Sequence, residues 1–315
     1  MSLRRLALPA AALLAICLIQ CSSPGTAAAY TTVHTGSGRP ALALAGGRLY
    51  ASWAGSTSGT YGKQLIIGTS VDGGRTFTKD NSVVERTPEG EGPALSADGP
   101  GVRLAWSAAN NGNTLTVAYT GGTGLQCRTA LTGVRTDRSP ALAADGTGIR
   151  WIAWTGTDSR INIARLSGGC PGGFSLQDRV TLAETTPYGP ALVFDDSGAE
   201  NGLLLGWTGA DGSINLGTVT TGSAVLTNRS TVIQPGQQLA TGGLGLTSHP
   251  ADLYVWFRAT DGSVRRGYSQ GCRPTCFYVY SSELQSASAV GVGTDGFHDT
   301  IGYFDARGKL NVATY

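Results

Sequence analysis

The stretch SPALAADGTGIRWIAWTGTDSRINIA, residues 139–164, contains the pattern that decides the fold. It opens with a Pro-Ala-Leu motif, passes through a turn rich in Gly and Asp, and continues as an apolar segment that ends at Trp154. A second turn, which contains Asp158, leads into another apolar run at residues 161–164. Short apolar runs separated by turns of this composition predict antiparallel β-hairpins.

The same unit recurs along the chain. The Pro-Ala-Leu motif stands at residues 40–42, 93–95, 140–142 and 190–192. Six apolar segments that end in an aromatic residue follow one another, and the aromatics are Trp53, Trp106, Trp154, Trp207, Trp256 and Tyr303. A unit repeated about every 48 residues accommodates four short strands with their turns, which is the size of one propeller blade.

The two ends of the chain complete this pattern. The last copy stops at Tyr315 after only three predicted strands, whereas residues 30–35 resemble the fourth strand that precedes each Pro motif. Pairing of these two ends would close a ring and remove its open edges. We therefore predict an all-β, six-bladed β-propeller with four-stranded antiparallel blades, closed by pairing of the N-terminal strand with the last blade.

Composition agrees with this prediction and excludes other classes of protein. The 315 residues include 47 Gly, 41% hydrophobic residues and only 14% charged residues. That mixture is too apolar for a disordered polymer. Because the one long apolar run is N-terminal, we expect no transmembrane segment in the mature chain.

The N-terminus has the order of a secretory signal peptide. Arg4 and Arg5 precede an apolar stretch at residues 6–19, and small residues follow at 27–29. We predict cleavage after Ala29, which leaves residues 30–315 as a single secreted domain. The alternative is a cell-surface lipoprotein anchored at Cys21, although Gln20 is larger than the residue that such a motif prefers.

Net charge argues against nucleic acid as a partner. The chain has 23 basic and 21 acidic residues, and removal of residues 1–29 takes away two Arg and no acid. The mature domain would therefore be formally neutral. Long-range attraction to nucleic acid or to anionic lipid is not expected.

Four cysteines remain in the predicted mature chain: Cys127, Cys170, Cys272 and Cys276. An even number of cysteines in an exported chain predicts disulfides, which we interpret as Cys127–Cys170 and Cys272–Cys276. The alternative, a zinc site with four thiolates, lacks paired Cys-x-x-Cys spacing. The three His share no ligand spacing. No metal and no cofactor is predicted.

One octapeptide connects the chain to a known family. Ser70-Val71-Asp72-Gly73-Gly74-Arg75-Thr76-Phe77 fits the Asp-box of sialidases, Ser-x-Asp-x-Gly-x-Thr-Trp/Phe, at Ser70, Asp72, Gly74, Thr76 and Phe77. The predicted mature chain resembles the six-bladed sialidase-like propellers, and also secreted bacterial proteins with Pro-Ala-Leu-Ala and Ala-Trp-Thr-Gly repeats. The box is a folding device, in which a carboxylate and a hydroxyl cap backbone N–H groups, and it identifies no chemistry.

For a sialidase, the resemblance implies three Arg on a substrate carboxylate, a Tyr nucleophile assisted by Glu, and an Asp acid/base, all on the rim opposite the Asp-box. Arg39 lies near the family's early Arg motif, but its surroundings read Ser-Gly-Arg-Pro. The segments that lead into the Pro-Ala-Leu strands also offer Glu91, Arg138 and Tyr188. Three functional Arg on one face would require Arg39, Arg138 and Arg258 to converge.

A break in the repeat singles out two further residues. Two positions after the aromatic, four copies have Gly or Ala, and the last two have Arg258 and Asp305. We take these two residues as candidates for a polar site, with Arg39 across the closure. The alternative is a structural salt bridge between the last two blades. Five Trp that end the second strand at equivalent positions, and Trp151 beside Trp154, are interpreted as core residues.

The family's Tyr-Glu pair cannot be assigned in this sequence. We therefore predict a secreted, non-catalytic propeller that recognises a glycan or a cell-wall polymer at its central rim. Two alternatives are an exo-sialidase-like glycoside hydrolase and a scaffold for protein partners.

Overall fold

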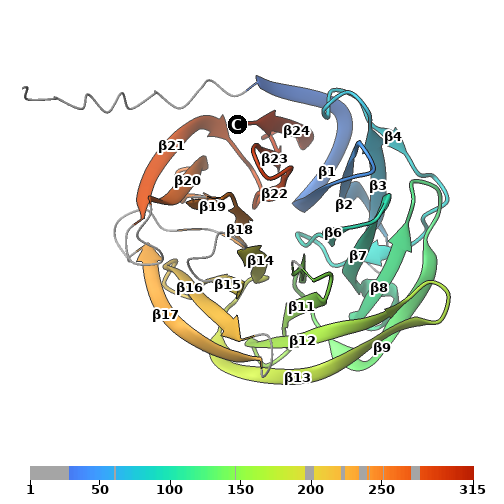
Figure 1. The fold of residues 1–315 in the computed structure, drawn as a ribbon. Helices are drawn as coiled ribbons and strands as arrows, with labels where there is room; N and C mark the ends of the chain where they lie inside the picture. Colours follow the sequence, from blue (N-terminus) through green and yellow to red (C-terminus); the bar gives the residue numbers. More distant parts are fainter. Residues whose placement is uncertain are drawn as a thin grey trace, which may run out of the picture.

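The computed structural model describes residues 28–59, 62–145, 147–195, 202–220, 224–233, 240, 242–250, 252–270 and 277–315 of the chain. These residues are predominantly β-structure, with one 3-10 turn, η1 (Ala109–Asn111), as the helical element among them. Antiparallel sheets stand around a central axis (Figure 1). The all-β propeller that the sequence predicts is confirmed.

Four sheets have four strands each, and each is a meander in chain order. The first two sheets consist of β6 (Ala94–Asp98), β7 (Gly101–Ala108), β8 (Thr114–Thr120) and β9 (Gln126–Arg135), and of β10 (Ala141–Ala144), β11 (Arg150–Thr155), β12 (Arg160–Gly169) and β13 (Gly173–Thr185). The other two consist of β14 (Ala191–Asp195), β15 (Gly202–Thr208), β16 (Ile214–Thr220) and β17 (Val225–Ile233), and of β18 (Gly245–Ser248), β19 (Asp252–Arg258), β20 (Ser263–Gln270) and β21 (Tyr278–Gln285).

The fifth sheet has eight strands, among them the first and the last of the chain. Its members are β22 (Gly291–Thr294), β23 (Asp299–Phe304), β24 (Lys309–Thr314), β1 (Ala28–Ala45), β2 (Arg48–Gly59), β3 (Gly62–Ser70), β4 (Thr78–Lys79) and β5 (Arg86–Thr87). Residues 28–35 of β1 pair with β24, and residues 36–45 pair with β2. The N-terminal strand therefore pairs with the last strand, as the sequence predicts. β1 begins two residues before the predicted cleavage point.

The second strand of each sheet is buried on both faces because neighbouring sheets cover it. Every residue of β7 and of β15 is buried, and strands covered on both faces are continuously apolar. Trp53, Trp106 and Trp154 are at most 1% exposed. Trp151, Trp207 and Trp256 are also buried. The interpretation of the Trp as core residues is confirmed.

Strand register corrects the alignment of one copy. Ala141 pairs with Ala153 in β11, whereas the corresponding Gly245 pairs with Trp256 in β19. Trp256 therefore occupies the place of Ala153, and the next residue, Phe257, occupies that of Trp154. The prediction that Trp256 is equivalent to the other strand-ending Trp is wrong, and its side chain lies on the opposite face of the sheet.

The turn at residues 70–77 is closed by its own side chains. The hydroxyl of Ser70 accepts a hydrogen bond from the Gly74 N–H at 2.8 Å, and Asp72 accepts hydrogen bonds from the side chain and the N–H of Thr76 at 2.6 and 3.0 Å. These bonds, the Thr76 hydroxyl first, lower the pKa of Asp72. Phe77 is buried with its ring centroid 6.3 Å from that of Trp53.

A disulfide joins Cys127 of β9 to Cys170 after β12, with their Cα atoms 5.4 Å apart. This pairing is the one that the sequence predicts. The described residues do not include Cys272 and Cys276. They also do not include the predicted signal segment up to residue 27, which contains Cys21. Within the described ranges, no cluster of His, Cys, Asp or Glu has the makings of a metal site. Nor does any helix there have the length and apolarity to span a membrane.

Candidate functional site

Six segments that lead into the inner strands meet at one end of the axis and enclose a cavity of about 520 Å³. We call this cavity the mouth, and the residues that line it are 37–39, 90–91, 138–139, 187–189, 242–243 and 287–289. Ser70 pairs with Leu49 beside the β1–β2 turn, so the 70–77 turn lies at the other end of the axis. Four of the predicted site residues, Arg39, Glu91, Arg138 and Tyr188, line the mouth.

Each segment contributes two positions toward the axis. The residue directly before the Pro, or before its counterpart, forms an inner ring, and its members are Arg39, Gly92, Ser139, Gly189, Gly243 and Ala289. The residue before that forms an outer ring, and its members are Gly38, Glu91, Arg138, Tyr188, Gly242 and Ser288. The large outer side chains come from three consecutive segments.

Local hydrogen bonds fix the outer ring. The backbone N–H groups of Arg138, Tyr188 and Ser288 each donate to a Thr or Ser hydroxyl two residues earlier, at 3.1 Å. The last residue of the preceding second strand then donates to a carbonyl of the segment, as Thr155 does to Tyr188 O at 2.6 Å. Thr208 does the same to Gly242 O at 2.9 Å. These contacts hold the outer side chains on a rigid frame.

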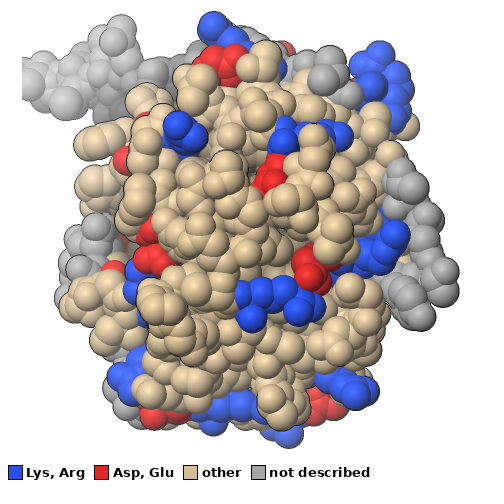
Figure 2. Space-filling model, turned by 90° about the vertical axis from the view of Figure 1, so that its right-hand side faces the viewer, with Lys and Arg blue, Asp and Glu red and all other residues tan. Residues whose placement is uncertain are grey.

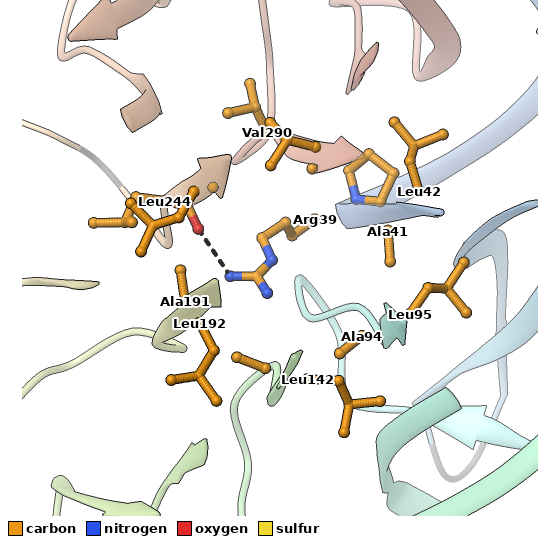
Figure 3. A pocket seen from close by; sticks show the side chains of 16 residues that line it. Arg39, Ala41, Leu42, Ala94, Leu95, Leu142, Ala191, Leu192, Leu244 and Val290 are labelled. Carbon is orange, nitrogen blue, oxygen red and sulfur yellow. Dashed lines mark hydrogen bonds between the residues drawn. The ribbon is translucent and has the colours of Figure 1, made fainter. Parts of the chain in front are cut away.

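Arg39 crosses the axis below the mouth (Figure 3). Its Nη1 donates to Pro190 O at 3.2 Å and to Leu244 O at 3.3 Å, and its Nη2 donates to Pro140 O at 3.1 Å. The guanidinium thereby joins three other inner-strand segments in a waist of about 70 Å³. Burial lowers the pKa of Arg39, and the charge of Glu91 opposes this shift.

Small residues make room for this side chain. A Cβ at Gly243 would lie 3.0 Å from Arg39 Nη1. Gly92 makes room for the backbone instead, because a Cβ there would lie 1.7 Å from the main-chain O of Arg39. The Arg39 side chain therefore closes the inner end of the mouth, and its Nη groups donate hydrogen bonds to backbone carbonyls.

Glu91 is held in place by Ser139. The N–H and the hydroxyl of Ser139 each donate to Glu91 Oε2 at 2.7 Å, and the same hydroxyl accepts from the Gly92 N–H at 2.8 Å. Arg138 Nη1 lies 3.6 Å from Glu91 Oε1, and the Arg138 side chain remains 39% exposed. The mouth thus has one fixed acceptor beside a cationic donor that ligand can reach.

Arg258 has a different place from the predicted one. Ala259 N donates to Ser263 O just as Gly156 N donates to Arg160 O, so Arg258 corresponds to Thr155 and not to Gly156. Like Thr155 it ties down the next segment, because its Nε donates to Ser286 O at 2.6 Å. Arg258 does not line the mouth. The sialidase alternative would require Arg39, Arg138 and Arg258 to converge, and Arg258 does not join the other two at the mouth.

Asp305 caps the turn of its own hairpin. In the equivalent turns the capping Asp stands third, as in Asp158, which accepts from the Arg160 N–H. In the last turn Asp305 stands first and accepts from the N–H groups of Arg307 and Lys309, each at 2.9 Å. Burial would raise the pKa of Asp305, but these N–H groups and Arg307 outweigh it and lower the pKa.

A side chain at the first position is compatible with an Asp at the third, because Ala259 stands first in the turn that Asp261 caps. The last turn differs in that the capping Asp itself stands first. Asp305 forms its ion pair with Arg307, at 3.1 Å, and not with Arg258 as the alternative of a structural salt bridge would require.

Ser288 and Gly242 of the outer ring were missed in the sequence. Counting three residues back from the first residue of each inner strand would have found them. Outside the mouth, the flank in Figure 2 shows basic and acidic side chains interspersed among other residues, without a large area of one sign.

Comparison with known proteins shows the fold. No protein-family model and no curated protein matches the chain. AofleA from Arthrobotrys oligospora is 10% identical with a TM-score of 0.64, and the match covers 92% of this chain and 86% of that one.

Two further solved structures are similar. The Aleuria aurantia lectin, described as a six-bladed β-propeller with a novel mode of fucose recognition, is 10% identical with a TM-score of 0.57, over 80% of this chain and 77% of the lectin. Trypanosoma rangeli sialidase is 9% identical with a TM-score of 0.60, over 93% of this chain and 60% of the sialidase. The chain thus shares the propeller fold of lectins and of glycosidases.

Proposed function

We propose that this chain is a non-catalytic carbohydrate-binding propeller that recognises a glycan or a cell-wall polymer at the mouth. One observation carries the proposal. Glu91, Arg138 and Tyr188 project from three consecutive segments, whereas the other three outer positions are Gly38, Gly242 and Ser288. The result is a half-ring of polar side chains beside a space of about 520 Å³, within the usual size of small-ligand sites.

The chemistry of this half-ring suits a saccharide. Sugar hydroxyls both donate and accept hydrogen bonds, and the mouth offers a carboxylate acceptor at Glu91 and a guanidinium donor at Arg138. Tyr188 adds an aromatic ring on which a pyranose can stack. The glycines of the lining leave backbone groups without side-chain cover. The similarity to the Aleuria aurantia lectin supports this assignment.

The described residues of the mouth lack the pair of carboxyl groups that most glycoside hydrolases need. Most glycosidases place two carboxyl groups on opposite sides of the scissile bond. Among the described residues that line the mouth, Glu91 is the one carboxylate, and Ser139 already donates two hydrogen bonds to it. A sialidase would use three Arg, but the Nη groups of Arg39 donate to carbonyls and Arg258 lies elsewhere. These points favour binding over catalysis.

We further infer that the eight-stranded sheet corresponds to two blades that share β1, which would give six blades in all. The 70–77 turn is proposed to be an Asp-box, because its capping bonds are those expected of one. Residues 1–29 are proposed to be a signal peptide of a secreted protein, with lipid attachment at Cys21 as the alternative. The intact mass of the exported protein distinguishes the two.

A glycan array together with fluorogenic glycosides tests the function. We expect binding without turnover, and a loss of at least tenfold in affinity for Arg138→Ala and for Tyr188→Ala. Arg307→Ala is the matched control, because this Arg is exposed on a hairpin outside the mouth. Turnover that disappears in Tyr188→Phe would instead establish a glycosidase. Silence in both assays would favour a scaffold for protein partners.

A further inference from the structure

The shifted register of β19 gives the β18–β21 sheet an unusual face. Trp256, Arg266 and Tyr280 are cross-strand neighbours in one row. Tyr254, Tyr268 and Tyr278 form the adjacent row on the same face. We call these six residues the tyrosine face. Figure 1 shows β19, β20 and β21 beside β22, β23 and β24 of the eight-stranded sheet. From that side Tyr315 contacts Trp256, with ring centroids 4.9 Å apart.

The rings form a continuous surface from the core to the solvent. Tyr268 lies in the middle, with its ring centroid 6.0 Å from that of Tyr254, 5.8 Å from Tyr278 and 5.4 Å from Tyr280. Trp256 is fully buried at the inner end. Tyr278 and Tyr280 are 50% and 40% exposed at the outer end, so both rings are accessible from the solvent.

Arg266 lies among these rings without a polar partner. Its Cζ is 5.4 Å from the ring centroid of Tyr254, 5.5 Å from that of Trp256 and 5.8 Å from that of Tyr315. Within the described ranges, its guanidinium has no hydrogen-bond acceptor and no ion pair. Arg266 is half-buried, where unpaired N–H groups are costly unless water or a ligand accepts from them.

The nearby buried carboxylate of Asp299 already has other polar partners. Asp299 Oδ1 lies 2.7 Å from His249 Nε2, and Asp299 Oδ2 accepts from Trp256 Nε1 at 2.8 Å. Among the described residues, Asp252 and Glu283 are further charged groups near this face, and their charges act to raise the pKa of Tyr254 and of Tyr315 respectively. The guanidinium of Arg266 is thus held by aromatic rings in a fixed place, with its donors left for an incoming anion.

We propose that the tyrosine face is a second binding site, and that its ligand is an anionic saccharide. A carboxylate or sulfate group accepts hydrogen bonds from the planar fork of Arg266, and the sugar ring stacks on the exposed Tyr278 and Tyr280. The class of ligand rests on the proposed function as a carbohydrate-binding protein. The site itself does not, because it shares no residue with the mouth.

Isothermal titration with three probes tests this site. The probes are trigalacturonate, its neutral methyl ester, and a sulfated disaccharide of the chondroitin type. We expect at least one of the two anionic probes to bind, the ester to bind at least tenfold more weakly than the free acid, and affinity to fall as salt rises. Binding of the carboxylate alone or the sulfate alone identifies the anion that Arg266 prefers.

Variants locate the binding. Arg266→Gln and Tyr278→Ala should each lower the affinity at least tenfold, and Arg266→Lys should retain part of it because the charge stays while the fork is lost. Arg307→Gln and Tyr188→Ala are matched controls outside this face. Should Arg266→Gln fail to fold, Tyr278→Ala decides, because this exposed side chain can be removed without opening the core.

Two results would overturn the inference: binding unchanged in Arg266→Gln and Tyr278→Ala, or no binding of either anionic probe to the wild-type protein. Loss of anion binding only in Tyr188→Ala would place the ligand in the mouth and equally reject the tyrosine face. Failure of the mouth variants on the glycan array, with anion binding intact, would reject the proposed mouth and leave the tyrosine face standing.

Discussion

Replacing Arg39 tests whether this side chain holds the propeller together at its axis. Arg39→Met keeps the volume of the side chain but removes three hydrogen bonds of 3.1 to 3.3 Å. A hydrogen bond from a charged donor contributes about 1.5–3 kcal/mol, and bonds of this length belong at or below the lower end. Relief of the cost of burying the guanidinium offsets part of the loss. We expect the free energy of unfolding to fall by about 3 kcal/mol.

Urea denaturation followed by circular dichroism measures this change, and a loss of that size lowers the melting temperature by roughly 6–12 °C. The free energy of unfolding of Arg39→Lys should lie between those of the wild type and of Arg39→Met. The ammonium group keeps the charge but lacks the planar fork that reaches carbonyls on both sides of the axis. Arg307→Met, at an exposed Arg, is the control. If Arg39→Met stays within about 0.5 kcal/mol of the wild type, which is the range of an ordinary surface substitution, Arg39 does not hold the axis.

Three further predictions concern Gly243 beside Arg39, the 70–77 turn and the disulfide. Gly243→Ala places a Cβ 3.0 Å from Arg39 Nη1 and should cost about 1–3 kcal/mol in urea denaturation, with a smaller effect when combined with Arg39→Met because the two share one contact. Asp72 has a lowered pKa in the folded chain, so its contribution to stability is present at neutral pH and is lost as the pH falls through the folded pKa; Asp72→Asn should lower the urea midpoint at pH 7 and narrow the difference between pH 7 and pH 3. Replacing both Cys127 and Cys170 by Ser should cost about 4 kcal/mol, and a reducing agent should shift the urea midpoint more in the wild type than in the variant, because the predicted Cys272–Cys276 pair is present in both.

The sequence was sufficient for the fold because the repeat is regular. Pro-Ala-Leu motifs mark the inner strands, and counting back from them places Glu91, Arg138 and Tyr188 around the same mouth. The copy with Arg258 was misaligned because Trp256 and Phe257 are adjacent aromatics, and sequence alone does not show which of them pairs opposite the inner strand. A register shift of one residue moves the following side chains of the strand to the opposite face of the sheet.

The role of Arg39 depends on information that no linear pattern contains. Its three acceptors are carbonyls at Pro140, Pro190 and Leu244, which are more than a hundred residues away in sequence. A backbone carbonyl is present at every residue, so the sequence does not mark those that face the axis. The unpaired state of Arg266 is hidden for the same reason, since it depends on which side chains surround it.

The two rings of the mouth differ in how freely they can vary, and this difference locates specificity. At the inner ring, a Cβ at Gly92 would lie 1.7 Å from Arg39 O, and one at Gly189 would lie 2.2 Å from Ser139 O, so neighbouring segments force small residues there. The outer positions Glu91, Arg138, Tyr188 and Ser288 have different side chains on the same backbone frame, whereas Gly38 and Gly242 have positive φ, and a Cβ at Gly38 would lie 2.7 Å from Glu91 O. Backbone geometry therefore constrains the inner ring and these two glycines, and the other four outer positions are where we expect substitution to change the ligand without unfolding the propeller.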